Sequence, residues 1–551
     1  MPKHPADYDA VVVGAGFSGI RSLWELRQRG LSFKCFEAGA DVGGAWYWNC
    51  YPGARTDSEA WVYTLNFAPE IREEWNYTER YPSQREVQHF LGRIVDKFHL
   101  REYIEFNCRI KSAHYNKETK LWTITAGNGT AVTCQYFLPA TGPLSIAKAP
   151  PFPGLKTYTG EWYQASNWPK SDVDLRGKRV AIIGTGATGV QIIPKIAPAV
   201  KQLTVFQRSP SYVLPGRNYI IDQNQTQEIK CNFDATLYAA KNHPNGLAMK
   251  PSGKTVQDAR DADKVRQTLD AGWEEGGFHY QFETFDDIFT NAESNETASE
   301  YIRQKIRAIV HDPEVAETLC PKYPFLSKRP PCGHFYYEAY NRPNVKLVNI
   351  SKQEIDLYEK GIRTTSGTEY EFDVIIFAIG YEAATGALSE LDVRGLEGKS
   401  LGGNWSKRID TFAGCLVPGF PNLFLICGPH VPFGNMPVVV DIQVNWIGQT
   451  IAYMEQKKLA CIDVTENAVA DWSAELDETF KVTVFAESAK ASRSWFVGAN
   501  IPGKVQTVLF YFGGVPAYTA KLEREISAGW PSMRFIPSTV TNGVGHDVNG
   551  I

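Results

Sequence analysis

The stretch "YDAVVVGAGFSGIRSLWELRQRG", residues 8–30, decides the fold of the amino-terminal region. Its β-branched run at residues 11–13 predicts a buried parallel strand, and residues 20 to about 29 predict an amphipathic helix. Between the two, the glycines have the spacing G-x-G-x-x-G. Because this loop joins a strand to a helix, it predicts a nucleotide-binding unit rather than an ordinary turn.

Three glycines and one acidic residue indicate what this unit binds. Gly14 permits the tight turn, Gly16 lets a pyrophosphate approach the backbone, and Gly19 allows the helix to pack closely on the strand. The next strand, "SFKCFE" at residues 32–37, ends in Glu37, whose carboxylate can accept a hydrogen bond from a ribose 2′-hydroxyl. The first unit is therefore predicted to bind FAD.

The same pattern recurs at residues 178–196, "KRVAIIGTGATGVQIIPKI", with Gly184, Gly186 and Gly189 in the loop. Its second strand leads into "QRSP" at residues 207–210, so no carboxylate stands where Glu37 does. Arg208 and Ser209 suit a 2′-phosphate instead, although a solvated surface arginine is the alternative. The second unit is predicted to bind NADPH, and two different dinucleotides imply a flavoprotein that takes hydride from a nicotinamide.

The sequence thus predicts an α/β fold with two Rossmann-like dinucleotide-binding domains and a helical insertion in the NADP domain. Small-residue turns ending at Gly142 and Gly380 mark crossings between the domains, and "PNLFLICGPH" at residues 421–430 is expected to form a strand of the first domain. The expected segments are 1–150 and 386–551 for the FAD domain, 151–217 and 335–385 for the NADP domain, and 218–334 for the insertion.

Composition excludes several classes of function. The chain of 551 residues has a net charge of −4 and a charged fraction of 21%, which gives no indication of nucleic acid as a partner. No apolar run is long enough for a membrane span, and neither a secretory signal nor a carboxy-terminal targeting tag is recognisable. The 10 cysteines lack C-x-x-C spacing, which favours reduced thiols in the cytoplasm over disulfides or a metal site. No obligate protein partner is evident.

Three further stretches resemble those of the Baeyer–Villiger monooxygenases, which are class B flavin monooxygenases. They are "GGAWYWNCYPGARTD" at residues 43–57, "SKRP" at 327–330 and "SWFVGANIPGK" at 494–504. The resemblance implies an enzyme that uses FAD, NADPH and O2 to insert one oxygen atom beside a ketone carbonyl through a C4a-peroxyflavin. The product would be an ester or a lactone, and the partner a small-molecule ketone.

The resemblance also implies roles for individual residues. Arg329 would stabilise negative charge on oxygen, and Asp57 would lie beside it and fix its orientation. Lys328 would join Arg208 and Ser209 at the 2′-phosphate. Trp495 would line the pocket and donate its indole N–H to the nicotinamide ribose, with simple packing in the core as the alternative. The other residues expected near the flavin are Phe17, Gly44, Trp46 and Tyr63.

The segment between the two glycine loops, "YTGEWYQASNWP" at residues 158–169, departs from the family fingerprint F-x-G-x-x-x-H-x-x-x-W-P. A register through Phe152, Gly154 and Trp162 competes, but it leaves no proline after the tryptophan. The chosen register places Tyr158 at the phenylalanine and Gln164 at the histidine. Glutamine keeps a donor and an acceptor but cannot carry charge, so a structured, uncharged hinge is predicted. Its members are Tyr158, Gly160, Gln164, Trp168 and Pro169.

Three rival functions are considered. A class B enzyme that oxygenates sulfides or amines would share both glycine loops, but the pairing of Asp57 with Arg329 favours a ketone. A disulfide reductase with two dinucleotide sites needs a redox pair of cysteines, and no such spacing occurs. A flavoprotein that oxidises NADPH without oxygenating a substrate remains open because Gln164 replaces histidine.

Overall fold

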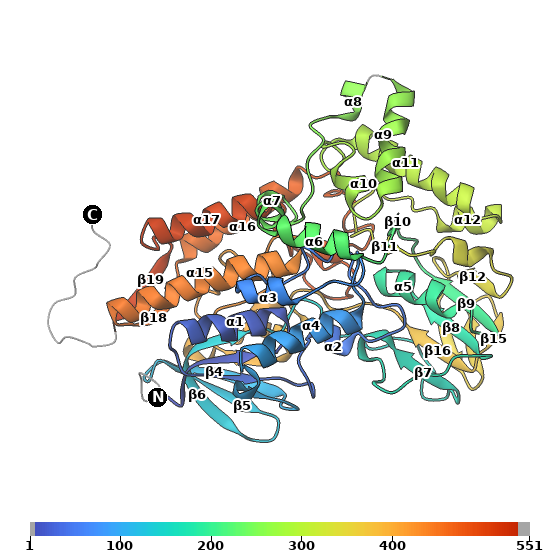
Figure 1. Cartoon of the computed structure of the whole chain (residues 1–551). Helices are drawn as coiled ribbons and strands as arrows, with labels where there is room; N and C mark the ends of the chain where they lie inside the picture. Colours follow the sequence, from blue (N-terminus) through green and yellow to red (C-terminus); the bar gives the residue numbers. More distant parts are fainter. Residues whose placement is uncertain (1–5, 260, 538–551) are drawn as a thin grey trace.

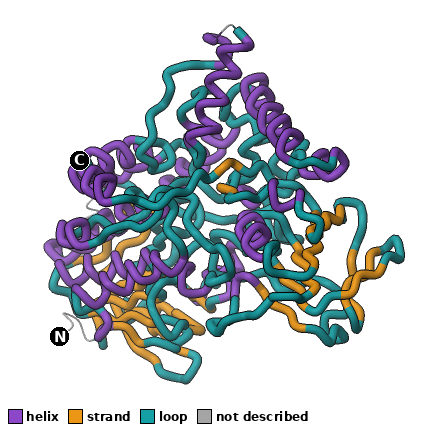
Figure 2. The backbone as a smooth tube through the Cα atoms, turned by 45° about the vertical axis from the view of Figure 1, so that its right-hand side comes forward, coloured by secondary structure: helices purple, strands orange, loops and turns teal. Residues whose placement is uncertain are grey.

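The computed structural model describes residues 6–259 and 261–537. Its strands gather in two separate groups, with most helices above and between them (Figure 2). The outer ends of the first and last expected segments, and the carboxy-terminal residues in which no targeting tag is recognised, lie outside the described residues. The segment boundaries themselves stay predictions.

The first sheet has the order β17-β4-β5-β6-β1-β2-β3. β6, β1, β2 and β3 run parallel, whereas β4 and β5 add an antiparallel hairpin. The parallel strands are nearly continuous apolar runs because both faces of the sheet are covered. The strands are β1 (Tyr8–Val13), β2 (Phe33–Phe36), β3 (Ile104–Glu105), β4 (Ile110–Asn116), β5 (Leu121–Ala126), β6 (Ala131–Pro139) and β17 (Asp392–Arg394).

The second sheet is wholly parallel, with the order β12-β9-β8-β16-β7. Its strands are β7 (Glu161–Gln164), β8 (Arg179–Ile183), β9 (Gln202–Gln207), β12 (Val345–Asn349) and β16 (Val374–Phe377). The segment expected to act as a hinge therefore supplies the edge strand β7, which pairs with β16. An α/β fold with two Rossmann-type units is confirmed, and the second sheet lies to the right of the first in Figure 1.

In each unit a helix follows the glycine loop. α1 (Phe17–Gln28) connects β1 to β2, and α5 (Ala187–Ile196) connects β8 to β9. The long α15 (Met436–Lys457) packs against α1, where Arg21 Nε lies 2.9 Å from Asp441 Oδ1. The carboxy-terminal part of the chain thereby covers the first unit.

Helices fill the chain between β10 (Leu214–Pro215) and β11 (Cys332–Gly333), and those at residues 256–309 form the top of the molecule in Figure 1. Asp222 and Gln225 form a capping box at the first of them, where each side chain accepts from the backbone N–H of the other. The helices are α6 (Gln223–Cys231), α7 (Phe233–Asn242), α8 (Val256–Ala259), α9 (Ala262–Glu275), α10 (His279–Phe282), α11 (Ala292–Ile309) and α12 (Pro313–Leu319).

The remaining elements surround the two units. The helices are α2 (Ala45–Trp48), α3 (Pro69–Glu74), α4 (Gln84–Lys97), α13 (Gly386–Glu390), α14 (Leu401–Trp405), α16 (Glu466–Lys481) and α17 (Val515–Ser527). The strands are β13 (Ile355–Tyr358), β14 (Gly361–Thr364), β15 (Glu369–Glu371), β18 (Leu459–Val464) and β19 (Met533–Pro537).

The two crossing segments lie side by side. Ala147 and Tyr381 form an antiparallel bridge, and Lys148 N donates to Gly380 O over 3.2 Å. The strand expected at residues 421–430 is wrong in part, because only Leu423 bridges to β6 through Phe137. Positive φ angles at Asn422 (57°) and Cys427 (54°) interrupt an extended conformation there.

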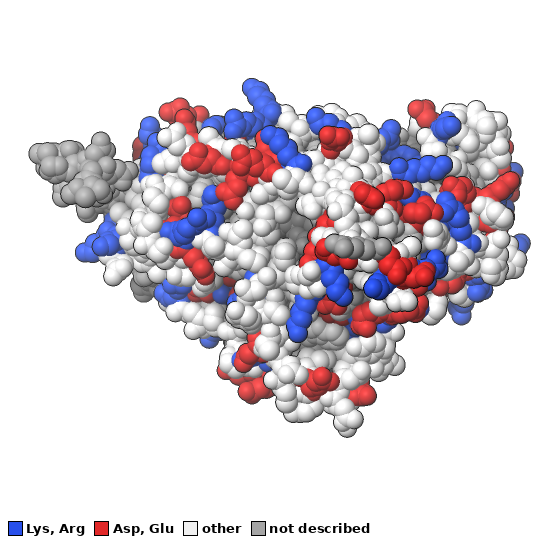
Figure 3. Space-filling view, turned by 90° about the horizontal axis from the view of Figure 1, so that it is seen from above, with Lys and Arg blue, Asp and Glu red and all other residues white. Residues whose placement is uncertain are grey.

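The surface agrees with the composition. Lysine and arginine are interspersed with aspartate and glutamate across the face in Figure 3, and no broad field of one sign covers that face. Within residues 6–259 and 261–537, no helix has both the length and the apolar character needed to cross a bilayer.

Candidate active site between two dinucleotide loops

The first glycine loop is closed by its surroundings. Gly14 has a φ of +106°, and a Cβ on it would lie 2.6 Å from Ala140 O. A Cβ on Gly19 would lie 1.9 Å from Gly14 O, so only glycine lets α1 approach the turn this closely. A Cβ on Gly16 would lie 3.2 Å from Gly44 Cα, in the segment that passes over the loop. This cradle fits the pyrophosphate of a dinucleotide.

Glu37 lies beneath the same loop. Its carboxylate is buried and accepts hydrogen bonds from Ala15 N and Gly39 N, both at 2.7 Å. Burial raises the pKa of Glu37, and these two N–H groups act in the opposite direction. The carboxylate is thus fixed at the end of β2, where the adenosine ribose of a bound dinucleotide belongs.

Three aromatic residues expected near the flavin contact one another. The rings of Phe17 and Tyr63 meet edge-on at 5.2 Å, and Trp46 Nε1 donates to Tyr63 Oη over 3.1 Å. Gly44, with a φ of +55°, turns the chain into the helix that carries Trp46. The segment over the first loop and its aromatic residues therefore form one assembly.

The second glycine loop has the same turn but no cover. Gly184 has a φ of +113°, and its Cβ would lie 2.3 Å from Ala378 O. A Cβ on Gly189 would lie 2.2 Å from Gly184 O, which repeats the helix contact of the first unit. A Cβ on Gly186, in contrast, would meet no atom within 4 Å. The loop is open on the side from which a cofactor would approach.

The residue that replaces the acidic partner in the second unit turns inward. Gln207 is buried, and its Nε2 donates to Thr318 O over 2.8 Å. Ser209 follows two residues later, and its carbonyl accepts from Thr185 Oγ1 at 3.0 Å. Arg208 between them is exposed. This arrangement offers a cation and no carboxylate.

Arg208, Lys328 and Arg493 form a cluster of cations from three parts of the chain. Burial, and then the positive charges of Arg208 and Arg493, lower the pKa of Lys328 to about 8. Within the described part of the chain, none of the three pairs with a carboxylate. Cations that repel one another without a counter-charge fit an anionic group of a ligand. Sequence reasoning missed Arg493, because nothing in "ASRSW" distinguishes it from a surface arginine.

Arg329 and Asp57 form an ion pair, with Nη1 and Oδ2 2.9 Å apart. The Asp57 side chain is 3% exposed and that of Arg329 is 36% exposed. Burial raises the pKa of Asp57, and the charge of Arg329 is the largest opposing influence. The backbone N–H of Cys332 and the side chain of Gln191 lower this pKa to a smaller extent. The negative charge of Asp57 therefore depends mainly on Arg329.

A pocket that opens to solvent begins at Arg329. Seven of its sixteen lining residues are phenylalanines from the insertion and from the carboxy-terminal part of the chain, and Ser58, Asn245, Gln281 and Asn435 contribute polar groups. Trp495 does not line this pocket; it packs behind the wall against Phe433 and Phe510. The seven phenylalanines of the wall are Phe278, Phe282, Phe289, Phe433, Phe485, Phe496 and Phe512.

Arg329 and its neighbour Lys328 thus lie at two different sites. Arg329 reaches Asp57 and the pocket, whereas Lys328 lies with Arg208 and over the ring of Tyr323, 4.8 Å from its centroid. One short segment therefore lies between the pocket and the cation cluster.

The segment expected to act as a hinge is held by hydrogen bonds. Tyr158 Oη donates to Phe372 O at 3.0 Å, and a Cβ on Gly160 would lie 2.3 Å from that hydroxyl. Gln164 Nε2 donates to Lys148 O over 2.6 Å. Trp168 is buried against Tyr163, and the carbonyl of Pro169 faces Cys50 Sγ at 3.7 Å.

Sequence reasoning also missed a charged contact between the insertion and the segment that follows Asp57. His279 lies 3.1 Å from Glu59 and 2.7 Å from Glu283, and Arg80 lies 2.8 Å from Glu59. Burial by itself would lower the pKa of His279, but these two carboxylates raise it to about 9. The contact joins residues 220 positions apart, which no local pattern reveals.

Comparison with known proteins agrees with this geometry. Residues 8–231 match the family described as Flavin-binding monooxygenase-like. The chain is 38% identical to a Baeyer–Villiger monooxygenase of Pseudooceanicola batsensis, over 96% of both proteins, and 37% identical to a phenazine N-monooxygenase of Lysobacter antibioticus, over 94% of this chain and 95% of that one. A crystal structure of cyclohexanone monooxygenase from Rhodococcus sp. Phi1 bound to NADP+ superposes with a TM-score of 0.93 at 35% identity, covering 98% of this chain and 100% of that one.

Proposed function

The chain belongs to the Baeyer–Villiger monooxygenases, and from that membership we propose that Arg329 and Asp57 form the centre at which it oxygenates a ketone. The enzyme uses FAD and NADPH and transfers one oxygen atom of O2 to a position beside the carbonyl, which gives an ester or a lactone. We assign the substrate to the class of small apolar ketones, because phenylalanine is the commonest residue in the pocket lining, at seven of sixteen positions.

One observation carries this assignment: Arg329 lies at the junction of a buried carboxylate and an apolar pocket. When bound, FAD supplies the activation of O2 and NADPH supplies the hydride. Arg329 offers a permanent positive charge where negative charge develops on oxygen. Asp57 orients the guanidinium, and the phenylalanine wall limits the access of water to the reacting atoms.

At the nicotinamide site, Arg208, Ser209 and Lys328 are proposed to bind the 2′-phosphate, with Arg493 as a further cation. Trp495 is proposed to contact the nicotinamide ribose from outside the pocket lining. A cytoplasmic location is proposed because the 10 cysteines are all free.

A second candidate activity is oxygenation of a nitrogen heterocycle, which is favoured by the similarity to the phenazine N-monooxygenase. A lone pair on nitrogen needs no carbonyl oxygen to be stabilised, so Arg329 would be less important for that reaction. Assaying one ketone and one phenazine with the same variant distinguishes the two activities.

Arg329→Ala tests the proposal. Ester formation should fall by at least about 10²–10³-fold, because removal of one comparable oxyanion donor already costs that much. NADPH should still be consumed, with hydrogen peroxide as the product, and FAD should stay bound. Arg329→Lys should restore little, since lysine lacks the planar fork.

Gas chromatography of the ester and a peroxide assay measure the two outcomes. Arg176→Ala is the matched control, because Arg176 is an exposed arginine paired only with Asp174. An Arg329→Ala enzyme that forms ester at a near-normal rate would show that a different cation does this work.

A further inference from the structure

Two tyrosines connect the segments that carry Arg208 and Lys328. Tyr212 Oη donates to Tyr323 O over 2.8 Å, and Tyr323 Oη donates to Pro210 O over 2.8 Å. Their rings meet edge-on, 5.5 Å apart at 85°. Each tyrosine therefore bonds to the backbone of the other's segment, and the contact is reciprocal.

These bonds lie close to the cations along the chain. Pro210 is two residues from Arg208, and Tyr323 is five residues from Lys328. The amine of Lys328 also lies over the ring of Tyr323. Further along, β10 and β11 pair in parallel, so the two segments are tied at a second point. Lys328 thus lies between two points of attachment, and Arg208 lies just before the first of them.

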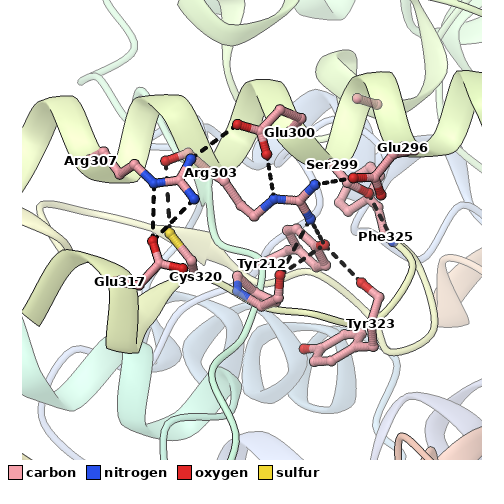
Figure 4. A network of polar contacts seen from close by, with 12 residues as sticks. Tyr212, Glu296, Ser299, Glu300, Arg303, Arg307, Glu317, Cys320, Tyr323 and Phe325 are labelled. Carbon is pink, nitrogen blue, oxygen red and sulfur yellow. Dashed lines mark hydrogen bonds and ion pairs between the residues drawn. The ribbon is translucent and has the colours of Figure 1, made fainter. Parts of the chain in front are cut away.

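A charged network supports the tyrosine pair from α11 (Figure 4). Arg303 Nη1 donates to Tyr212 Oη at 3.1 Å, and Glu300 and Glu296 accept from the same guanidinium, Glu300 at 2.7 Å. Tyr212 accepts from a cation and donates onward to Tyr323 O, and a hydroxyl used in this way is a stronger donor. The insertion therefore stiffens the contact between the two segments.

We infer that Tyr323 is a positioning residue, and that its hydroxyl holds Lys328 and the Arg208 segment at the separation that a 2′-phosphate requires. This inference rests on the proposed roles of Arg208 and Lys328. Two like charges would separate in the absence of an anion, and a tether that prevents the separation removes an ordering cost from binding. Tyr323 would thereby contribute to the selectivity for NADP over NAD without touching either cofactor.

Tyr323→Phe is the test, because it keeps the ring beneath Lys328 and removes only the hydroxyl. In the FAD-loaded protein, titration calorimetry should show the Kd for NADP+ rising about fivefold, the effect of one lost hydrogen bond. The Kd for NAD+ should stay within about twofold, and so should kcat at saturating NADPH. Tyr301→Phe is the matched control. Tyr301 lies on α11, the helix that carries Arg303, and the substitution removes a tyrosine hydroxyl that is bonded to Asp270.

The outcomes separate the inference from its premise. If the Kd values for NADP+ and NAD+ rise by the same factor, or if neither changes, the proposed role of Tyr323 is wrong. Arg208→Ala and Lys328→Met, measured in parallel, test the phosphate site itself. If those two variants leave the ratio unchanged, the proposed site is wrong, and the inference about Tyr323 is wrong with it.

Discussion

The two glycine loops share one turn and differ in what lies over it. In both, glycines with positive φ angles meet a backbone carbonyl of a neighbouring strand end, and the third glycine meets the first. Over the first loop, however, Gly44 lies 3.2 Å from the position of a Cβ on Gly16, whereas the position of a Cβ on Gly186 is empty to 4 Å. The same kind of glycine loop can therefore bind a cofactor that stays bound or one that exchanges. Which of the two it binds depends on whether a segment from elsewhere in the chain covers the loop.

The residues proposed to bind the adenosine ribose or its 2′-phosphate also differ between the two sites. Glu37 is buried and already bonded to two N–H groups, so its site is formed before a ligand arrives. Arg208 and Lys328 repel each other, so their site gains its counter-charge only when a ligand binds. A site of the first kind favours retention, and one of the second kind favours exchange.

Substitution of Glu37 should have the largest effect on the difference in affinity between the two sites. In Glu37→Ala, two buried N–H groups lose a charged acceptor, at a cost of about 1.5–3 kcal/mol each. The affinity for FAD should fall about 100-fold or more, while NADP+ binding to protein saturated with FAD changes little. The measurement is titration of flavin-free protein with FAD.

Gln207→Ala is the control for Glu37→Ala, because Gln207 has the equivalent place in the second unit. It should leave the affinity for FAD unchanged. If Glu37→Ala retains its flavin through gel filtration as the unchanged protein does, the first site does not depend on this carboxylate.

A pair of alanine substitutions sharpens the comparison. Gly16 and Gly186 both have ordinary negative φ angles, so alanine strains neither backbone. Gly16→Ala should weaken FAD binding about tenfold and lower the melting temperature of flavin-free protein, because overpacking costs about 1–3 kcal/mol. Gly186→Ala should leave both unchanged and affect only NADP+. Equal melting temperatures for the two variants would contradict the difference in cover.

The smallest expected effect is a dependence of the Kd for NADP+ on pH, which we expect at the second site alone. Lysine is charged below its pKa, and that of Lys328 is about 8. Between pH 7 and pH 9 the Kd for NADP+ should therefore rise several-fold, with a limit of about tenfold for one proton. The Kd for NAD+ should stay constant, and Lys328→Met should remove the slope. A slope that persists in Lys328→Met would assign the proton to another group.

Local patterns predicted both strand–loop–helix units, because such a unit is completed within about thirty residues. The prediction of a 2′-phosphate site at Arg208 rested on a missing carboxylate at one position. The placement of Asp57 beside Arg329 came only from resemblance, since 272 positions separate them and no periodicity spans that distance.

Contacts between distant segments were beyond reach for the same reason. The pocket wall combines phenylalanines from the insertion with others after residue 430, and each looks like ordinary core in its own stretch. Trp495 was chosen as a pocket residue and Phe496 was not, although the turn of the chain at Ser494 brings Phe496 to the wall. Arg493 and His279 were missed because their significance lies in their neighbours.

The bond from Gln164 to Lys148 has a consequence for how the two halves of the enzyme communicate. The carbonyl of Lys148 accepts from the amide of Gln164, and its amine donates to Asn500 O over 2.9 Å, in the stretch that also bears Trp495 and Phe496. A displacement of strand β7 is therefore transmitted through a single residue to the wall of the pocket. The bond at Gln164 contains no titratable atom, whereas burial and the charge of Arg208 lower the pKa of the Lys148 amine to about 8. Base therefore changes the charge only at the second bond of this link, the one to Asn500.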